Sequence, residues 1–345
     1  MLGAVVYAAA GERVRRISQV ATDSRTLRSQ ALIEMGRVVP FDAYVWPLTD
    51  PETSVGTEPL ASIPPTLMPA LPQLIRLKYL TEANRWTSLA ATARLVRPAD
   101  SRVWRELLRA HGVSDIASTV FRDRYGCWGF LDLWRIGGVF TSPELTFLDS
   151  IAERLTEDLR RCQARTFTAT RGARGPGPVV LLLAPDMQVL EQTPQTHDYL
   201  MRLLPTGAGM EPVPASAYNV AAQLVAVEEG IDLQPPCARV HLAAGRWLTL
   251  RAARLGPAGR SDAQIAVTIE EASPGERTAV FARAFGLTTR ETELLMHLTT
   301  GADTRAVATS MFLSANTVQD HLKSIFSKTG TRNRRTLLSR ALGTG

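Results

Sequence analysis

The sequence has few cysteines and no long apolar run. Its three cysteines, Cys127, Cys162 and Cys237, are odd in number and far apart, so they fit neither a disulfide framework nor a zinc site. We interpret them as buried structural thiols. No apolar stretch is long enough to span a bilayer, and the apolar start MLGAVVYAAAG lacks the basic residues of a signal peptide. We therefore expect a cytoplasmic protein with no membrane partner.

Common enzyme motifs are also missing. The sequence contains no G-x-x-x-x-G-K-[ST], H-E-x-x-H, G-x-S-x-G or C-x-x-C pattern, so P-loop nucleotide cleavage, zinc hydrolysis and an elbow serine are not indicated. Residues 1–60 show no paired aspartates after a first strand that could accept a phosphoryl group. His197 and His241 lack the partner pattern of a haem site. We predict that the chain is not an enzyme and that it uses no cofactor.

The positive charge of the chain is concentrated at its C-terminal end. Residues 283–345 carry nine basic and four acidic side chains, a net charge of +5, whereas the whole chain has +6. The first 282 residues, with 30 basic and 29 acidic side chains, are nearly neutral. Because a DNA-binding surface needs cations close to phosphates, this distribution favours DNA binding by the C-terminal region.

Residues 314–329, SANTVQDHLKSIFSKT, have the pattern of a helix with two different faces. At about 100° per residue, Val318, Leu322, Ile325 and Phe326 gather on one apolar side. The opposite side carries hydrogen-bonding side chains that suit base edges in the major groove. We predict that five residues face the bases: Asn316, Gln319, Asp320, Lys323 and Ser327.

Three further short helices are predicted around this one. Thr288 and Glu291 have the spacing of a capping box, and Gly301 and Gly330 can each end a helix. The predicted N-caps are Thr288, Asp303, Ser314 and Asn333. A short turn separates the helix capped by Asp303 from the helix capped by Ser314, and this is the helix-turn-helix arrangement, whose second helix enters the major groove. The sequence predicts an all-α C-terminal domain of four helices.

The stretch from LTTRETELLMHL to RRTLLSRAL resembles the LuxR-type, or LuxR/FixJ-type, helix-turn-helix of bacterial transcription regulators. The resemblance has no gap and includes Leu287, Thr288, Arg290, Glu291, Gly301, Thr317, Val318, His321, Lys328, Gly330 and Arg334. By position, it implies phosphate contacts from Thr317, His321 and Arg334. It also implies base contacts from Gln319, Asp320 and Lys323. Arg290, Lys328 and Arg335 complete the candidate phosphate-binding set.

Two departures from the LuxR pattern affect these expectations. Gln319 stands where the family usually has lysine or arginine, which leaves the target sequence open. Thr329 and Thr331 replace the usual leucine and valine, which indicates a looser core.

A second interpretation of the C-terminal helices stays open. Amphipathic helices with small polar faces also occur in modules that contact RNA polymerase or another protein without reading DNA. His321 could then be a histidine satisfied at an interface.

Two segments rich in glycine and proline divide the chain into three parts. Residues 165–177 and 273–282 are predicted linkers. They separate a first domain over 1–164, a second over 178–272 and the C-terminal domain over 283–345. We predict a multi-domain α+β fold, with two α/β sensor domains built on antiparallel sheets with flanking helices.

The end of the first domain has the clearest pattern. After a helical stretch over 12–38 and a strand in FDAYVWPL, the segment YGCWGFLDLWRIGG predicts a strand and a Gly-Gly turn, followed by a helix capped by Ser142. This segment resembles the closing strand and last helix of GAF domains attached to LuxR-type regulators in actinobacteria. The N-K-F-D-E string of cyclic-nucleotide-binding GAF domains is absent. Phe130, Trp128 and Trp134 are candidates for a sensor cavity, or else simple core residues.

The helix after this turn carries a narrow apolar seam. The seam consists of Leu145, Leu148, Ile151, Leu155 and Leu159. Such a seam can pair helices between subunits, or it can lie on the helix's own sheet. We favour the first, because tight binding of two DNA half-sites requires a dimer.

The middle domain has the element order of a PAS domain, which it resembles. VVLLLAPDMQVLEQTP predicts two strands about a Pro-Asp turn, and THDYLMRLLP and AYNVAAQLVAVEEG are helical. ARVHLAAGRWLTLRAARL predicts a hairpin, and AQIAVTIEEA a last strand. The predicted partners are double-stranded DNA, a second copy of the chain, RNA polymerase, and a small-molecule or protein signal that the sequence does not identify.

Overall fold

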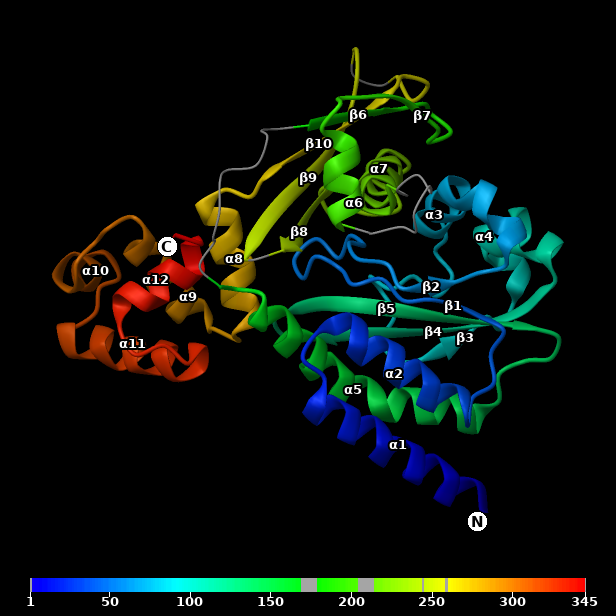
Figure 1. The fold of residues 1–345 in the computed structure, drawn as a ribbon, viewed down its shortest axis with the longest axis horizontal. Helices are drawn as coiled ribbons and strands as arrows, with labels where there is room; N and C mark the ends of the chain where they lie inside the picture. The colour runs from blue at the N-terminus through cyan, green and yellow to red at the C-terminus, as the bar shows by residue number, and fades with distance from the viewer. Residues whose placement is uncertain (1, 169–178, 204–213, 244, 258–259, 345) are drawn as a thin grey trace.

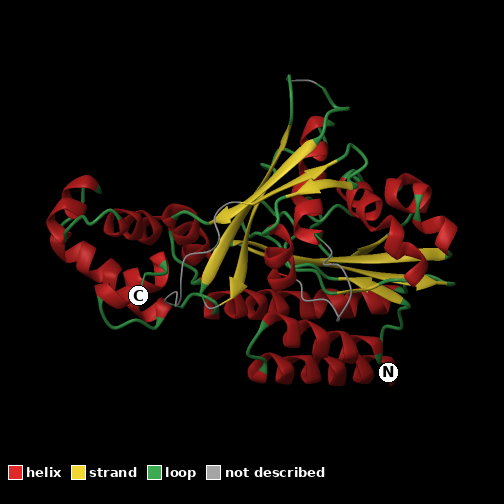
Figure 2. Ribbon diagram, turned by 45° about the horizontal axis from the view of Figure 1, so that its top comes forward, coloured by secondary structure: helices red, strands yellow, loops and turns green. Residues whose placement is uncertain are grey.

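The computed structural model describes residues 2–168, 179–203, 214–243, 245–257 and 260–344. They form two five-stranded antiparallel sheets and a group of helices at the C-terminal end (Figure 1). Figure 2 shows that the strands of the two sheets run in different directions. The predicted multi-domain α+β fold is confirmed. No helix in the described ranges has the length and apolar character needed to cross a bilayer.

The first sheet has the strand order β2-β1-β5-β4-β3, with every neighbouring pair antiparallel. Its strands are β1 (Ala43–Val45), β2 (Ala61–Ser62), β3 (Ala93–Arg94), β4 (Val113–Asp123) and β5 (Gly126–Ile136). The predicted strands in FDAYVWPL and GCWGFLDLW are confirmed as β1 and β5. Gly137 and Gly138, with positive φ values of 88° and 77°, form the expected turn after β5.

Helices cover both faces of the first sheet. One face carries α2 (Ser24–Gly36) and α5 (Ser142–Arg165), and α1 (Leu2–Val20) packs on these two helices. The other carries the 3-10 turns η1 (Pro65–Ala70), η2 (Pro98–Asp100) and η3 (Leu108–His111), with α3 (Leu71–Tyr79) and α4 (Arg102–Glu106). The helical stretch predicted over 12–38 is divided between α1 and α2, because the Asp23 carboxylate accepts from the Thr26 N–H at 2.8 Å and starts a new helix.

Helix α5 differs from the prediction at its start and in its seam. Thr141, not Ser142, is its N-cap: the Thr141 backbone N–H and hydroxyl donate to Glu144 at 2.7 and 2.9 Å. Leu148, Ile151, Leu155 and Leu159 are buried in the chain's own core, and Leu145 is half-buried against it. The favoured use of this seam as a joint between subunits is therefore wrong, because the helix lies on its own sheet.

The second sheet has the order β7-β6-β10-β9-β8, again fully antiparallel. Its strands are β6 (Val179–Leu183), β7 (Val189–Gln192), β8 (Cys237–Ala243), β9 (Arg246–Arg254) and β10 (Ile265–Glu271). Helices α6 (Thr196–Leu203) and α7 (Ala215–Glu228) pack on it. All five predicted strands and both predicted helices of this segment are confirmed. Numbered from the first strand of each sheet, the two sheets share one strand order, 2-1-5-4-3.

Five helices follow the second sheet. They are α8 (Pro274–Ala284), α9 (Thr289–Thr299), α10 (Thr304–Ser310), α11 (Ala315–Thr329) and α12 (Arg334–Leu342). The linker predicted over 273–282 is wrong, since this segment is the ordered helix α8 with Ser273 as its N-cap and Pro274 as its first residue. Val280 and Phe281 are fully buried. Of the linker predicted over 165–177, residues 169–177 lie outside the described part of the chain.

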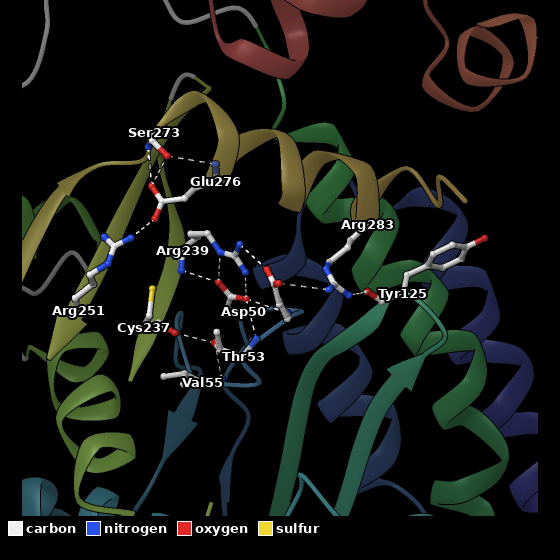
Figure 3. Close-up of polar contacts among 11 residues, drawn as sticks. Asp50, Thr53, Val55, Tyr125, Cys237, Arg239, Arg251, Ser273, Glu276 and Arg283 are labelled. Carbon is white, nitrogen blue, oxygen red and sulfur yellow. Dashed lines mark hydrogen bonds and ion pairs between the residues drawn. The ribbon is translucent and has the colours of Figure 1, made fainter. Parts of the chain in front are cut away.

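A buried ion pair joins the two sheets (Figure 3). Asp50, in the loop between β1 and β2, accepts from Nε and Nη2 of Arg239 on β8, both at 2.6 Å, and from the Arg239 backbone N–H at 2.7 Å. The Asp50 side chain is fully buried, and that of Arg239 is 7% exposed. Glu52, two residues after Asp50, lies 2.8 Å from Arg239 and 3.7 Å from Arg283 of α8. The loop therefore contacts both the second sheet and the start of the C-terminal helices.

Candidate nucleic-acid interface

The four C-terminal helices α9–α12 begin where the sequence predicts. Each predicted N-cap accepts a hydrogen bond from the backbone N–H three residues further on: Thr288 from Glu291 at 3.3 Å, Asp303 from Ala306 at 2.7 Å, Ser314 from Thr317 at 3.1 Å and Asn333 from Thr336 at 2.9 Å. Gly330 ends α11 in the left-handed conformation at φ 63°. These caps fix the directions in which the short helices leave their turns.

The apolar sides of α9–α12 share one core. Its fully buried members include Leu294, Leu295, Leu298, Val307, Met311, Val318, Ile325, Leu337 and Ala341. Thr329 and Thr331 are buried beside them, and their hydroxyls lie 2.8 Å apart, with Thr329 Oγ1 also 2.8 Å from the Ile325 carbonyl oxygen. A hydrogen-bonded hydroxyl pair replaces the usual apolar contact at this place, and the looser core expected from the two threonines stays a prediction.

The predicted base-facing side of α11 is open to solvent in the full chain. All five of its residues are exposed: Asn316, Gln319, Asp320, Lys323 and Ser327. Lys323 forms a 3.1 Å ion pair with Asp320 in which both side chains remain more than 70% exposed. Figure 1 shows α10 and α11 at one end of the molecule, away from both sheets. The base-facing side of α11 is therefore not covered by the described part of either sheet domain.

Four of the six predicted phosphate-binding residues have side chains with access to solvent and few internal contacts. Arg290 and Arg335 are exposed, and Arg290 pairs with Glu293 at 2.8 Å. Thr317 and His321 are half-buried at the edge of α11, and the Thr317 hydroxyl lies 2.9 Å from the Ser314 hydroxyl. Their positions are compatible with phosphate contacts, which stay a prediction.

The other two, Lys328 and Arg334, are held by partners inside the domain. The Lys328 ammonium donates to the Glu291 carboxylate at 2.6 Å, and the Arg334 guanidinium donates to the Ala302 carbonyl. The Ser324 hydroxyl also donates to Glu291, at 2.6 Å. Although burial opposes its ionisation, these bonds and those from Thr288 lower the pKa of Glu291 to about 2. Lys328 thus ties α11 to the start of α9, a contact that the sequence analysis missed.

The turn between α10 and α11 contains a residue that the sequence analysis did not single out. Phe312 has a left-handed backbone, at φ 56°, and its side chain is 95% exposed. A bulky residue in the left-handed conformation is strained, and the exposed aromatic ring buries no apolar surface that would offset this strain. Its place directly before the reading helix was visible in the sequence, but its exposure depends on the turn geometry.

A cavity of about 370 Å³ lies in the first sheet domain, and two of the three predicted cavity residues line it. Phe130 and Trp134 form part of its wall. Trp128 lies on the opposite face of β5, in the core beneath α5. The pairing of β5 with β4 skips Trp128, and such an extra residue shifts the side-chain alternation by one. Of the two alternatives left open for Trp128, the structure shows the simple core residue and not the cavity residue.

No group of histidine, cysteine or acidic side chains in the described ranges is arranged to hold a metal ion. The described cysteines are free thiols: Cys127 and Cys162 are buried, and Cys237 is half-buried. Burial raises the pKa of the Cys162 and Cys237 thiols.

Comparison with known proteins identifies the C-terminal helices. Residues 286–341 match the GerE family, "Bacterial regulatory proteins, luxR family". Among solved structures, the chain is similar to a "Sensor region of a sensor histidine kinase" at 16% identity, over 67% of this chain and 84% of that one, with a TM-score of 0.19, too low to establish a shared fold. No curated protein is matched. Residues 286–341 are therefore a luxR-family helix-turn-helix domain, and the chain that carries it is a DNA-binding transcription regulator.

Proposed function

We propose that α11 reads a specific DNA sequence in the major groove under the control of two sensor domains. The first, residues 1–164, is GAF-like, and the second, residues 178–272, is PAS-like; the DNA-binding domain spans 283–345. The protein acts in the cytoplasm as a homodimer and uses no cofactor. The shared strand order of the two sheets and the cavity in the first support the sensor assignment.

The observation that carries the DNA-reading role is the exposed polar face of α11. Gln319 and Asn316 present amides that can pair with adenine, and Lys323 can donate to guanine. The opposite side of the same helix is fully used in the core. A helix with this division of side chains has one surface left for recognition.

Helix α8 contacts both the sensor region and the DNA-binding domain. Its Arg277 donates to the carbonyl oxygens of Thr168, after α5, and of Arg340, on α12, both at 3.0 Å, and also to that of Gly245, before β9. Burial lowers the pKa of Arg277 to about 10. One side chain therefore contacts the segment that follows the first sensor domain, the second sensor domain and the DNA-binding domain.

A dimer is proposed because one small domain with a net charge of +5 supports modest affinity, and two half-sites multiply it. The buried seam of α5 cannot be the joint. Another surface must bring the two protomers together.

The test is selection of the full-length protein against randomised duplexes at low and moderate salt. We expect enrichment of an inverted repeat with half-sites about one helical turn apart. Lys323→Ala relaxes the selected sequence at one position in each half-site, while Arg335→Ala weakens all duplexes alike. Arg97→Ala is the matched control, because it removes an exposed cation paired with Asp100 in the first domain, as Lys323 is paired with Asp320. Equal, uniform losses from Lys323→Ala and Arg335→Ala contradict base reading.

The competing function is a module that contacts RNA polymerase or another protein without reading DNA. The salt dependence of duplex affinity distinguishes the two functions. A DNA reader loses duplex affinity steeply as salt rises, because each phosphate contact releases a counterion. Absence of enrichment by both the full chain and residues 283–345 favours the competing function.

A further inference from the structure

The cavity of the first sheet domain is closed by a helix of the second. Its floor is the face of β5 that carries Phe130, Asp132 and Trp134, and α3 forms one side. Ala215 and Asn219, on the first turns of α7, complete the wall. Beside them, the Ser216 hydroxyl donates to the Thr57 carbonyl oxygen at 2.7 Å and holds α7 against the first domain. The cavity is therefore lined by residues of both sensor domains.

Asn219 offers a polar group at the cavity wall. Its side chain is 8% exposed and makes no hydrogen bond to another described residue, so its amide can pair with a molecule in the cavity. Trp134 also lines the cavity, but its unpaired indole N–H is enclosed by protein atoms and has no surface that an occupant could reach. A polar atom of an occupant therefore has Asn219 as its partner.

Two of the three charged side chains on the wall, Lys78 and Asp132, form an ion pair, and the third, Arg25, is exposed. The Lys78 ammonium lies 2.7 Å from the Asp132 carboxylate, and the two side chains are 15% and 7% exposed. Asp132 also accepts from the Ser118 hydroxyl at 2.7 Å, and Lys78 lies 5.4 Å from the centre of the Phe130 ring. A charged ligand group next to Lys78 and Asp132 would have to break this buried pair or remain uncompensated, and both are unfavourable.

We propose that this cavity binds a small, neutral, mostly apolar molecule whose carbonyl or similar acceptor bonds to the Asn219 amide. The ligand gives the first sensor domain its signal, so this inference rests on the proposed function and specifies its chemistry. The volume of about 370 Å³ is within the range of small-molecule sites. Because Asn219 belongs to α7, binding pulls the second sheet domain against the first. That movement reaches α8, which follows the last strand of the second sheet.

The test uses 6-propionyl-2-(dimethylamino)naphthalene, a neutral fluorescent ketone whose emission shifts to the blue in apolar surroundings. Titration into the full-length protein should give a saturable, one-to-one blue shift. Asn219→Leu keeps the size of the side chain and removes the amide, so affinity for the ketone should fall about fivefold. The parent 2-(dimethylamino)naphthalene, which lacks the carbonyl, should bind equally to the wild-type protein and the variant.

Two further variants test whether the ketone binds in this cavity. Met68, 44% exposed on the cavity wall, tolerates Met68→Trp, which should weaken both probes by narrowing the cavity. Asn316→Leu makes the same chemical change on the DNA-reading face, and it should leave ketone binding unchanged while altering duplex selection. Failure of the ketone to bind wild-type protein, or binding to Asn219→Leu and Met68→Trp as tight as to the wild type, overturns the cavity proposal. Loss of duplex selection alone would instead overturn the DNA-reading function.

Discussion

The carboxylate of Glu291 connects two helices of the DNA-binding domain, α9 and α11. It accepts from Thr288 at the start of α9 at 2.6 Å, and from Ser324 and Lys328 of α11, each also at 2.6 Å. Its side chain is 4% exposed. The reading helix is therefore positioned by one acid that itself faces away from DNA.

Replacement of Glu291 by glutamine should loosen α9 and α11. We expect Glu291→Gln to lower the free energy of local opening by about 2 kcal/mol at neutral pH, because Lys328 loses its charged partner. The pKa of Glu291 is lowered to about 2 in the folded protein, so its stabilisation is complete above the ordinary value near 4.5 and is lost as the pH falls between the two. Amide hydrogen exchange in α9 and α11 measures both effects.

Glu293→Gln is the matched control for this prediction. Glu293 lies on the same helix and pairs with Arg290 at 2.8 Å, but both side chains are at least 40% exposed. Such a surface pair contributes little. Equal exchange in the two variants would contradict the role given to Glu291.

At the scale of single residues, the sequence predicts on which side of a helix a residue lies better than it predicts which residue that side chain contacts. The exposed side of α11 follows from periodicity alone, and all five residues lie where the pattern puts them. The bond of Lys328 to Glu291, 37 positions away, depends on how two helices cross. From the sequence alone, a lysine beside the base-facing side of a helix is therefore interpreted as a phosphate contact. The structure is needed to show that its partner is an acid inside the domain.

Helix α8 packs against both the second sheet and the DNA-binding domain. Its N-cap Ser273 accepts from the Glu276 N–H at 3.3 Å, and the Ser273 N–H donates back to the Glu276 carboxylate at 2.8 Å. Glu276 also pairs with Arg251 of β9 (Figure 3). The start of α8 is thus attached directly to the second sheet.

Loss of this cap should weaken α8. We expect Ser273→Ala to lower the stability of the helix by about 1 kcal/mol, because an orphan backbone N–H loses its acceptor. Hydrogen exchange should speed up in α8 and in α12, which packs on it. Ser310→Ala, at the exposed C-terminal end of α10, is the control and should change neither. Unchanged exchange in Ser273→Ala would mean that the burial of Val280 and Phe281 alone fixes the helix.

The errors at this scale have local physical causes. Ser-Pro-Gly fits a loop, but it also fits a helix start, and the Glu276 three residues after Ser273 was the signal that could have separated them. The same argument favours Thr141 over Ser142, because Glu144 follows Thr141 by three. The bulge at Trp128 left no comparable signal, since an extra residue in a strand is fixed by pairing with the neighbouring strand.

At the scale of the whole molecule, the loop around Asp50 contacts all three parts of the chain. Asp50 pairs with Arg239, and Glu52 reaches both Arg239 and Arg283. Thr53 adds a hydroxyl bond to the Cys237 carbonyl oxygen at 2.7 Å. Asp50 and Arg239 are 189 positions apart, and no pattern in the sequence pairs them. The three segments could be delimited from composition, but their docking could not.

The Asp50 pair should control how firmly the sheet domains dock. Asp50→Asn leaves the Arg239 cation buried without its counter-charge, and breaking a buried pair in this way costs about 3–5 kcal/mol. We expect hydrogen exchange to rise in β8 and in the loop around Asp50. It should also rise at the C-terminal end of α8, because Asp50 and Glu52 lie in one loop, and a looser loop no longer holds Glu52 near Arg283. Thermal unfolding should separate into distinct steps for the two sheets.

Asp262→Asn supplies the comparison, since Asp262 pairs with Arg260 at 2.9 Å with both side chains at least 60% exposed. Removal of that surface charge should leave both the exchange and the unfolding curve as they are. If Asp50→Asn behaves in the same way, the sheets are held by their apolar contacts and the ion pair only fixes their orientation. If the two variants differ as expected, the Asp50–Arg239 pair and the ligand-driven movement of α7 act on the same interface, the one between the two sheet domains. Duplex affinity of Asp50→Asn should then no longer respond to a ligand in the cavity.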